Sequence, residues 1–169
     1  MTDIVLAIEA YLARRLETDL LEMARRYFAA RRWPCELVAD GRALEVAQDW
    51  SGMPFKSRAH VKGGGPTFIY DSCCPEVAPA DRRDAVARYL TRVNAGMLVG
   101  AFEMDWDTGA IRCRTAIDLH GGTLTEELLG GVVYPHHQAM IDYLSNLVAV
   151  LRGEQDPDDA YRETQESIG

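Results

Sequence analysis

The stretch EMDWDTGAIRCRT at residues 103–115 spaces its oxygen-bearing side chains like the start of a calcium-binding loop, with Asp105, Asp107 and Gly109 two residues apart. An EF-hand loop needs oxygen ligands at its first, third and fifth positions and a bidentate glutamate at its twelfth. Counted from Asp105, the fifth position is Gly109 and the twelfth is Ala116. Two carboxylates without further ligands do not enclose an ion, so the sequence predicts no calcium site.

A β-hairpin accounts for more of the same stretch. If the chain reverses at Thr108-Gly109, apolar residues face each other on one side and opposite charges on the other, as a half-buried antiparallel pair requires. The predicted pairs are Trp106–Ile111, Met104–Cys113, Asp105–Arg112 and Glu103–Arg114.

Adjacent thiols at Cys73 and Cys74 are the second candidate for chemistry, because they could bind zinc or exchange disulfides. On a strand their side chains point to opposite faces, so at most one could join Cys113 on the core side. A structural zinc site needs four converging ligands, and the sequence has neither C-x-x-C nor H-x-x-x-H. We expect packing cysteines and no metal or other cofactor. A small thiol- or metal-dependent protein centred on Cys73 and Cys74 is the alternative function.

Two further motifs invite a chemical interpretation. The run KGGGPT, from Lys62 to Thr67, leads into a strand-like segment rather than the helix that a phosphate-binding P-loop requires, so it predicts a hairpin turn. The neighbours His136 and His137 lie about 100° apart on a helix and cannot share one metal, so exposed or capping roles are expected. No catalytic residue is predicted.

Composition and charge limit the function classes. The chain has 169 residues, 47% hydrophobic and 26% charged, which is typical of one soluble globular domain. Its net charge of -8 disfavours nucleic acid and anionic membrane surfaces as partners. No apolar run approaches the roughly 20 residues of a membrane span, and acids stand where a signal peptide carries basic residues. Four cysteines agree with a reducing compartment, so we expect a cytoplasmic protein.

The elements that would position these residues follow from hydrophobic periodicity. An N-terminal helical arm over 4–32 is predicted as one helix, or as two if the D-x-x-E pattern from Asp19 to Glu22 starts a second. A three-stranded antiparallel meander, a helix beginning near Asp81, a two-stranded hairpin and a last apolar helix ending at Gly153 come next. The acidic segment from Glu154 onward predicts a solvated, frayed tail. The fold class is therefore α+β.

Several short motifs resemble the YbjN-like family of proposed bacterial sensory transduction regulators. The resemblance covers residues 19–162, which leaves 1–18 as an N-terminal helical extension and 163–169 as an acidic tail. The matching residues are Asn94, Gly100, Phe102, Asp105, Gly109, Arg114, Leu119, Leu124-Thr125-Glu126, Gly153, Pro157 and Ala160.

The resemblance implies a two-layer fold like that of type III secretion chaperones, often dimeric, and no catalytic residue. It favours a non-enzymatic module that binds an unidentified protein as a chaperone-like or regulatory adaptor, acting as a homodimer. Three surfaces are open as the dimer contact. They are the strand around Phe102 to Trp106, the last helix around Met140 to Leu151, and the helical arm before Asp19.

Overall fold

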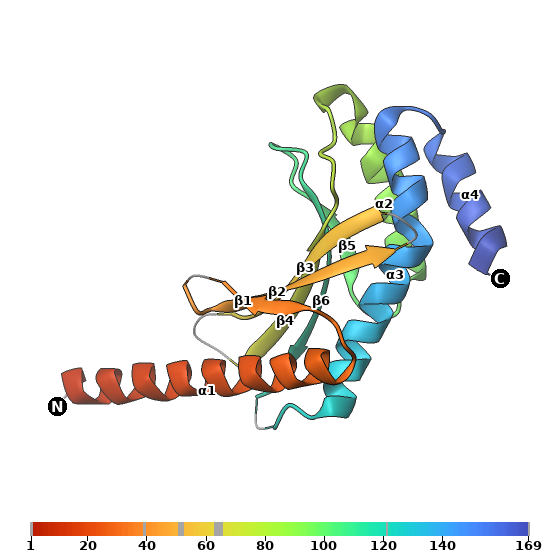
Figure 1. The fold of residues 1–169 in the computed structure, drawn as a ribbon. Helices are drawn as coiled ribbons and strands as arrows, with labels where there is room; N and C mark the ends of the chain where they lie inside the picture. The colour runs from red at the N-terminus through yellow and green to blue at the C-terminus, as the bar shows by residue number, and fades with distance from the viewer. Residues whose placement is uncertain (1, 39, 51–52, 63–65, 121, 169) are drawn as a thin grey trace. The chain divides into compact units, whose positions relative to one another are not determined.

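A computed structural model describes residues 2–38, 40–50, 53–62, 66–120 and 122–168 (Figure 1). It confirms the α+β class. The elements are α1 (Thr2–Ala30), β1 (Cys35–Leu37), β2 (Ala43–Trp50), β3 (Met53–Val61), β4 (Thr67–Cys73), a 3-10 turn (Ala80–Arg82), α2 (Arg83–Gly96), β5 (Ala101–Met104), β6 (Ile111–Asp118), α3 (Glu126–Arg152) and α4 (Pro157–Ile168). The strands follow the order β1-β2-β3-β4-β6-β5.

The chain packs as two compact units that interleave in sequence. Unit 1 comprises residues 1–70 and 116–132, and unit 2 comprises residues 71–115 and 133–169. Strands β4 and β6 and helix α3 each contribute residues to both units. The boundaries expected at residues 18 and 162 both fall inside helices, α1 and α4.

The predicted meander forms, and a short strand precedes it. Antiparallel registers pair Leu37 with Leu44 and Leu44 with Ala59, which joins β1, β2 and β3. Burial alternates cleanly along β3, where Phe55, Ser57 and Ala59 are buried and the residues between them are exposed. Strand β1 was not predicted because three residues are too few to show a period.

Helix α1 is one continuous helix rather than two. Glu22, expected to cap a second helix, instead accepts hydrogen bonds from Arg25 and Arg26 one turn further along. The C-terminal half of α1 packs on β1, β2 and β3. Its buried residues are Leu20, Leu21, Ala24, Tyr27 and Phe28.

In unit 2, the side chain of Asn94 ties α2 to β5. Its Nδ2 donates to the carbonyl oxygen of Phe102 at 2.8 Å, and its Oδ1 accepts from the amide of Phe102 at 2.8 Å. One side chain therefore supplies both hydrogen bonds that a neighbouring strand would otherwise offer.

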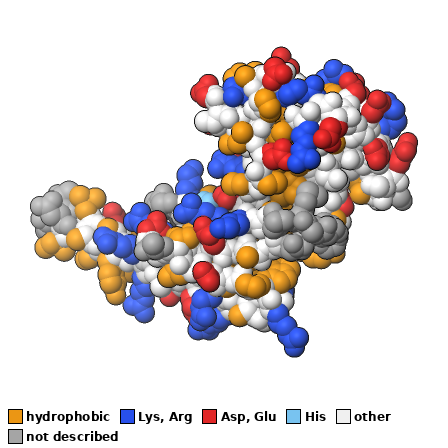
Figure 2. Space-filling view, turned by 45° about the horizontal axis from the view of Figure 1, so that its top comes forward, with side chains coloured by type: hydrophobic (Ala, Val, Ile, Leu, Met, Phe, Trp, Pro, Cys, Tyr) orange, Lys and Arg blue, Asp and Glu red, His pale blue; other side chains and the backbone are white. Residues whose placement is uncertain are grey.

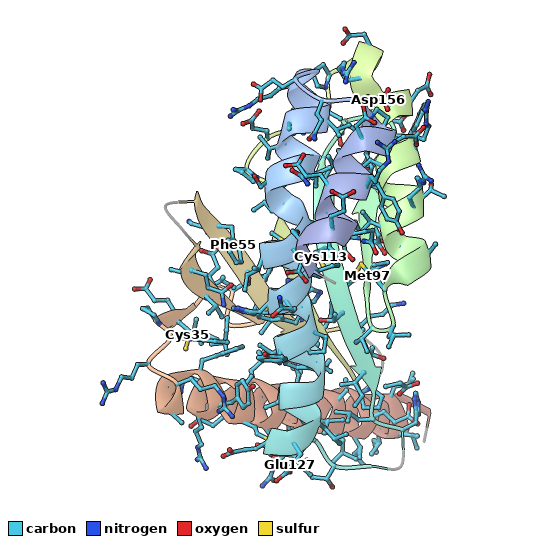
Figure 3. The ribbon with its side chains drawn as sticks, turned by 90° about the vertical axis from the view of Figure 1, so that its right-hand side faces the viewer. Cys35, Phe55, Met97, Cys113, Glu127 and Asp156 are labelled. Carbon is cyan, nitrogen blue, oxygen red and sulfur yellow. The ribbon has the colours of Figure 1, made fainter. Side chains whose placement is uncertain are left out.

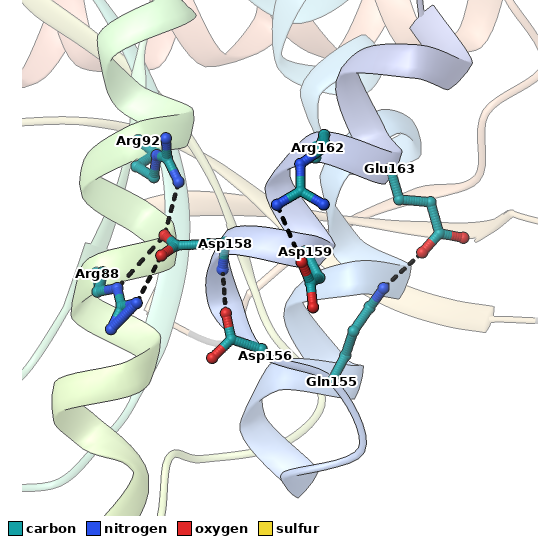
Figure 4. A network of polar contacts seen from close by, with 8 residues as sticks. All are labelled: Arg88, Arg92, Gln155, Asp156, Asp158, Asp159, Arg162 and Glu163. Atoms are coloured by element: carbon teal, nitrogen blue, oxygen red, sulfur yellow. Dashed lines mark hydrogen bonds and ion pairs between the residues drawn. The ribbon is translucent and has the colours of Figure 1, made fainter.

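The acidic C-terminal segment forms a helix, so the prediction of a frayed tail was wrong. Pro157, Ala160 and Thr164 of α4 are buried. The Nδ2 of Asn146 on α3 donates to Thr164 Oγ1 at 2.7 Å, and Asp158 forms ion pairs of 2.6 Å with both Arg88 and Arg92 of α2 (Figure 4). One of these acids, Asp158, is therefore paired with arginines of another helix, and the local sequence around it does not show those partners.

The hairpin forms as predicted, but its register differs by two residues. Met104 pairs with Ile111 and Phe102 with Cys113, so the expected pairing of Trp106 with Ile111 was wrong. Trp106 lies beyond the strand and is 56% exposed. A shift of two preserves which face each side chain occupies. Glu103 consequently still pairs with Arg114, and also with Arg112 directly opposite.

The turn of this hairpin depends on Gly109. Its φ is +75°, and a Cβ at this position would lie 2.1 Å from the carbonyl oxygen of Ala78. Gly41 has a similar φ of +70°, and a Cβ added there would have nothing within 4 Å. An alanine at position 41 therefore tests the effect of backbone conformation on stability without a steric clash.

We predict that Gly109→Ala lowers the free energy of unfolding by at least about 3 kcal/mol, because backbone strain and a backbone clash add. Gly41→Ala should cost only about 1 kcal/mol, from the left-handed conformation alone. Urea denaturation of both variants measures the difference. Equal costs would show that the contact with Ala78 is not rigid.

Candidate functional site

The most unusual surface among the described residues is the first half of α1. Ile4, Val5, Ile8, Tyr11, Leu12 and Leu16, which we name the arm stripe, are 41–66% exposed. This part of α1 extends past the strands that its second half covers (Figure 1). Figure 2 shows hydrophobic side chains along the projecting segment. Exposed apolar surfaces are typical of sites that contact another molecule, so the first half of α1 is the candidate functional site.

A hollow of about 380 Å³ opens in unit 1 at the base of the arm stripe. Most of its lining is apolar, and Leu16 belongs to both the hollow and the arm stripe. The lining residues are Leu16, Asp19, Leu20, Met23, Pro66, Leu119, His120, Gly122, Thr123 and Leu124.

The other two surfaces considered for a dimer are largely inside the chain. Phe102 on β5 is buried, and so are Met140, Leu144 and Leu147 on α3. Among the described residues of these three surfaces, only those of the arm form an exposed row of large apolar side chains.

The calcium-like loop is a turn whose carboxylate is used by the turn itself. Asp105 Oδ1 accepts hydrogen bonds from the amides of Asp107 and Thr108 at 3.0 and 2.8 Å, and from the Thr108 hydroxyl at 2.9 Å. These hydrogen bonds, chiefly those from Thr108, lower the pKa of Asp105. The carboxylate therefore serves as an Asx-type cap.

The four cysteines differ in exposure. Cys73 is exposed at the end of β4, and Cys74 and Cys35 are half-buried. Cys113 is buried on β6 (Figure 3). Burial raises the pKa of Cys74 and raises that of Cys113 to about 12, which disfavours the reactive thiolate at both. Within the described ranges, no three His, Cys, Asp or Glu residues are placed to hold a metal ion. The structure gives the thiol or metal alternative no support.

His136 is fully buried, so the expectation of an exposed or capping histidine was wrong. Its Nε2 lies 2.6 Å from Ser72 Oγ, and its Nδ1 lies 3.4 Å from Thr115 Oγ1. Burial lowers the pKa of His136 to about 3, and that of the neighbouring His137 to about 4. A serine beside a histidine resembles a nucleophile and its base, but Ser72 and Thr115 are themselves buried. We interpret the cluster as packing that joins α3 to β4 and β6.

The remaining sequence candidates are also structural. The glycines of the KGGGPT run lie outside the described residues, while the Lys62 amide donates to the Thr67 carbonyl at 2.9 Å, as expected for a hairpin. The exposed His120 lies 2.6 Å from Asp118 within the same turn.

We predict that stability falls as pH decreases from about 6.5 to 5, because the buried His136 and the half-buried His137 stay neutral when folded and take up protons when unfolded. The pKa of the folded state lies below the ordinary value of 6.5. The contribution of the neutral histidine to stability is therefore complete above pH 6.5 and is lost as the pH falls below that value. His137→Gln should reduce the slope of unfolding free energy against pH by about 1 kcal/mol per unit. His120→Gln is the exposed control, and an unchanged slope in His137→Gln would contradict the prediction.

We also predict that calcium does not bind at Asp105, since its carboxylate already accepts three hydrogen bonds from the turn. Calorimetric titration with calcium should show no stoichiometric binding. A binding signal that disappears in Asp105→Asn would contradict this interpretation.

Most residues that carry the family resemblance have structural roles. Asn94 and Asp105 satisfy backbone groups, Gly100 and Gly109 have positive φ, and Thr125 Oγ1 accepts from the Leu128 amide at the start of α3. A side chain at Gly100 would meet Thr115 at 2.5 Å. The shared motif therefore specifies a fold rather than a reaction site.

Comparison with known proteins agrees with this. The chain matches the crystal structure of YbjN, described as "a putative transcription regulator from E. coli", with a TM-score of 0.53 and 16% identity. The match covers 79% of this chain and 90% of that chain. No curated protein matches the sequence. No helix in the described part of the chain is both long and apolar enough to cross a membrane.

The model of the YbjN family, described as "Putative bacterial sensory transduction regulator", matches residues 21–134. This range begins after the arm stripe and ends within α3. Because the match includes more than half of the 169 residues, the chain belongs to the YbjN family.

Proposed function

We propose that this protein is a non-enzymatic regulatory adaptor of the cytoplasm that binds another protein and acts as a homodimer. The observation that carries the proposal is the exposed apolar surface of α1. Seven of the fifteen exposed large hydrophobic side chains in the described residues lie between Ile4 and Leu16. Monomeric proteins seldom leave such a surface in water, so a protein contact is the natural role for it.

The polar residues support a binding role over catalysis. Asp105, His136 and Asn94, the most suggestive of them, each form hydrogen bonds within the fold. Burial raises the pKa of Cys113, the most buried thiol, to about 12. The family's description as a regulator points in the same direction.

Charge favours protein over nucleic acid or membrane as the partner. The net charge is -8, and the arginines of α1 are interspersed with acids. Arg25 and Arg26 both pair with Glu22. An anionic polymer or lipid surface would have to displace these pairs.

The experiment is co-isolation from extracts of the native host with the affinity-tagged full chain, followed by mass spectrometry. Leu12→Asp introduces a charge into the arm stripe, and Ala13→Asp introduces the same charge at the adjacent position. We expect a specific protein other than the chain itself to be retained by the wild type and by Ala13→Asp. We expect it to be lost from Leu12→Asp, because the partner requires the homodimer that this surface of α1 assembles.

Retention of no other protein would contradict the adaptor function. Equal retention by all three forms would contradict the assignment to α1. Circular dichroism of both variants confirms that the fold is unchanged, since both positions are exposed.

A further inference from the structure

The arm stripe occupies one side of α1, distinct from the side that packs on the strands. At about 100° per residue, its six residues fall within an arc of about 140°. The buried residues Leu20, Leu21, Ala24, Tyr27 and Phe28 are centred about 150° away. The arm stripe is therefore a second apolar face rather than a continuation of the face that packs in unit 1.

Its spacing is suited to another helix. Val5, Ile8 and Leu12 are separated by three and four residues, and Ile4, Ile8, Leu12 and Leu16 by four each. Rows with both spacings pack against a helix nearly aligned with them, at a crossing angle of about 20°.

We propose that the arm stripe binds the same stripe of a second copy, as an antiparallel two-fold helix pair centred near Ala10. The row Ile4, Ile8, Leu12, Leu16 is symmetric about position 10. Reversal therefore sets Ile4 opposite Leu16 of the second copy and Ile8 opposite its Leu12. A two-fold contact requires such a self-complementary surface. This inference rests on the proposed function, because it identifies the contact that makes the homodimer.

The surface is large enough for a specific dimer. Burying a large aliphatic side chain removes roughly 100 Å² from water, so the two stripes together would bury on the order of 1,200 Å². Specific stable interfaces begin at about 1,200 Å² of total buried surface. The polar residues beside the stripe add to this area.

The charges of the arm favour a second copy over a membrane surface. Helices that lie on membranes carry many Lys and Arg residues on their polar face. From Ile4 to Asp19 the arm has Arg14 and Arg15 against Glu9, Glu17 and Asp19. This mixed and slightly acidic set does not attract anionic lipid, and it creates no strong repulsion between two arms.

The first test is sedimentation of the full chain over a hundredfold dilution from about 100 μM, where an interface of standard size stays associated. We expect twice the 18.8 kDa mass of one chain for the wild type and for Ala13→Asp. Leu12→Asp should raise the dissociation constant at least about 100-fold, because each copy would bury an unpaired carboxylate opposite Ile8 of the other. A wild-type monomer throughout, or an equally dimeric Leu12→Asp, would overturn the inference.

The second test measures orientation by disulfide cross-linking. Ile4→Cys and Leu16→Cys are made separately in a chain with Cys35, Cys73 and Cys74 replaced by Ser, and the two variants are mixed. The antiparallel pair predicts a heterodimeric disulfide, since positions 4 and 16 are about 18 Å apart along one helix but adjacent across the pair. Homodimeric disulfides in each variant alone would indicate a parallel pair and overturn the inference.

The two proposals fail separately. If the chain is monomeric but another protein is lost with Leu12→Asp, the adaptor function holds and the second copy is not the occupant. If the chain dimerises through the arm but retains no other protein, the inference holds and the adaptor function fails. Binding of the wild type to anionic vesicles, lost in Leu12→Asp, together with a monomeric mass would assign the arm stripe to a membrane.

Discussion

Polar side chains buried inside this protein must find hydrogen-bond partners there, and their pairing fixes how its helices meet its strands. His136 meets Ser72 and Thr115, which joins α3 to two strands, while Asn94 supplies α2 with both backbone contacts of Phe102. A buried group left alone would cost more than its contact contributes when made. The apolar core sets how closely the elements approach, and these polar contacts select one arrangement among those that pack equally well.

Hydrophobic periodicity was enough to predict the α+β class and most of the elements. Phe55, Ser57 and Ala59 alternate with exposed residues on β3, and Val86, Tyr89, Leu90 and Val93 share one face of α2. These signals are local, so the sequence displays them directly.

The register of the β5–β6 hairpin is harder to predict, because it depends on how two strands align rather than on the pattern within one of them. Glu103 lies near Arg112 and Arg114, which are two residues apart. The predicted and the observed register therefore both place Glu103 opposite an arginine. The turn geometry around Asp105 and Gly109 selects between them.

The features that sequence analysis missed depend on contacts between distant segments. His136 was expected at the surface because no pattern shows that residues 72 and 115 surround it. Helix α4 was not predicted because its segment is rich in acids, and the arginines that pair with Asp158, Arg88 and Arg92, are about seventy residues away along the chain. The apolar residues of the arm were visible in the sequence, but their exposure was not. Helical spacing identifies an apolar stripe without showing what covers it.

Helix α1 has one half that packs on strands β1, β2 and β3 and one half whose large apolar side chains are exposed. From Ile4 to Leu16 its large apolar side chains are exposed, so these turns are held by their own hydrogen bonds and by continuation from the packed half. An isolated helix as short as the segment from Ile4 to Leu16 is only marginally stable in water. Docking would thus also order the backbone, and part of the binding free energy would be consumed in doing so. An arm of this kind favours association that is specific yet readily reversible.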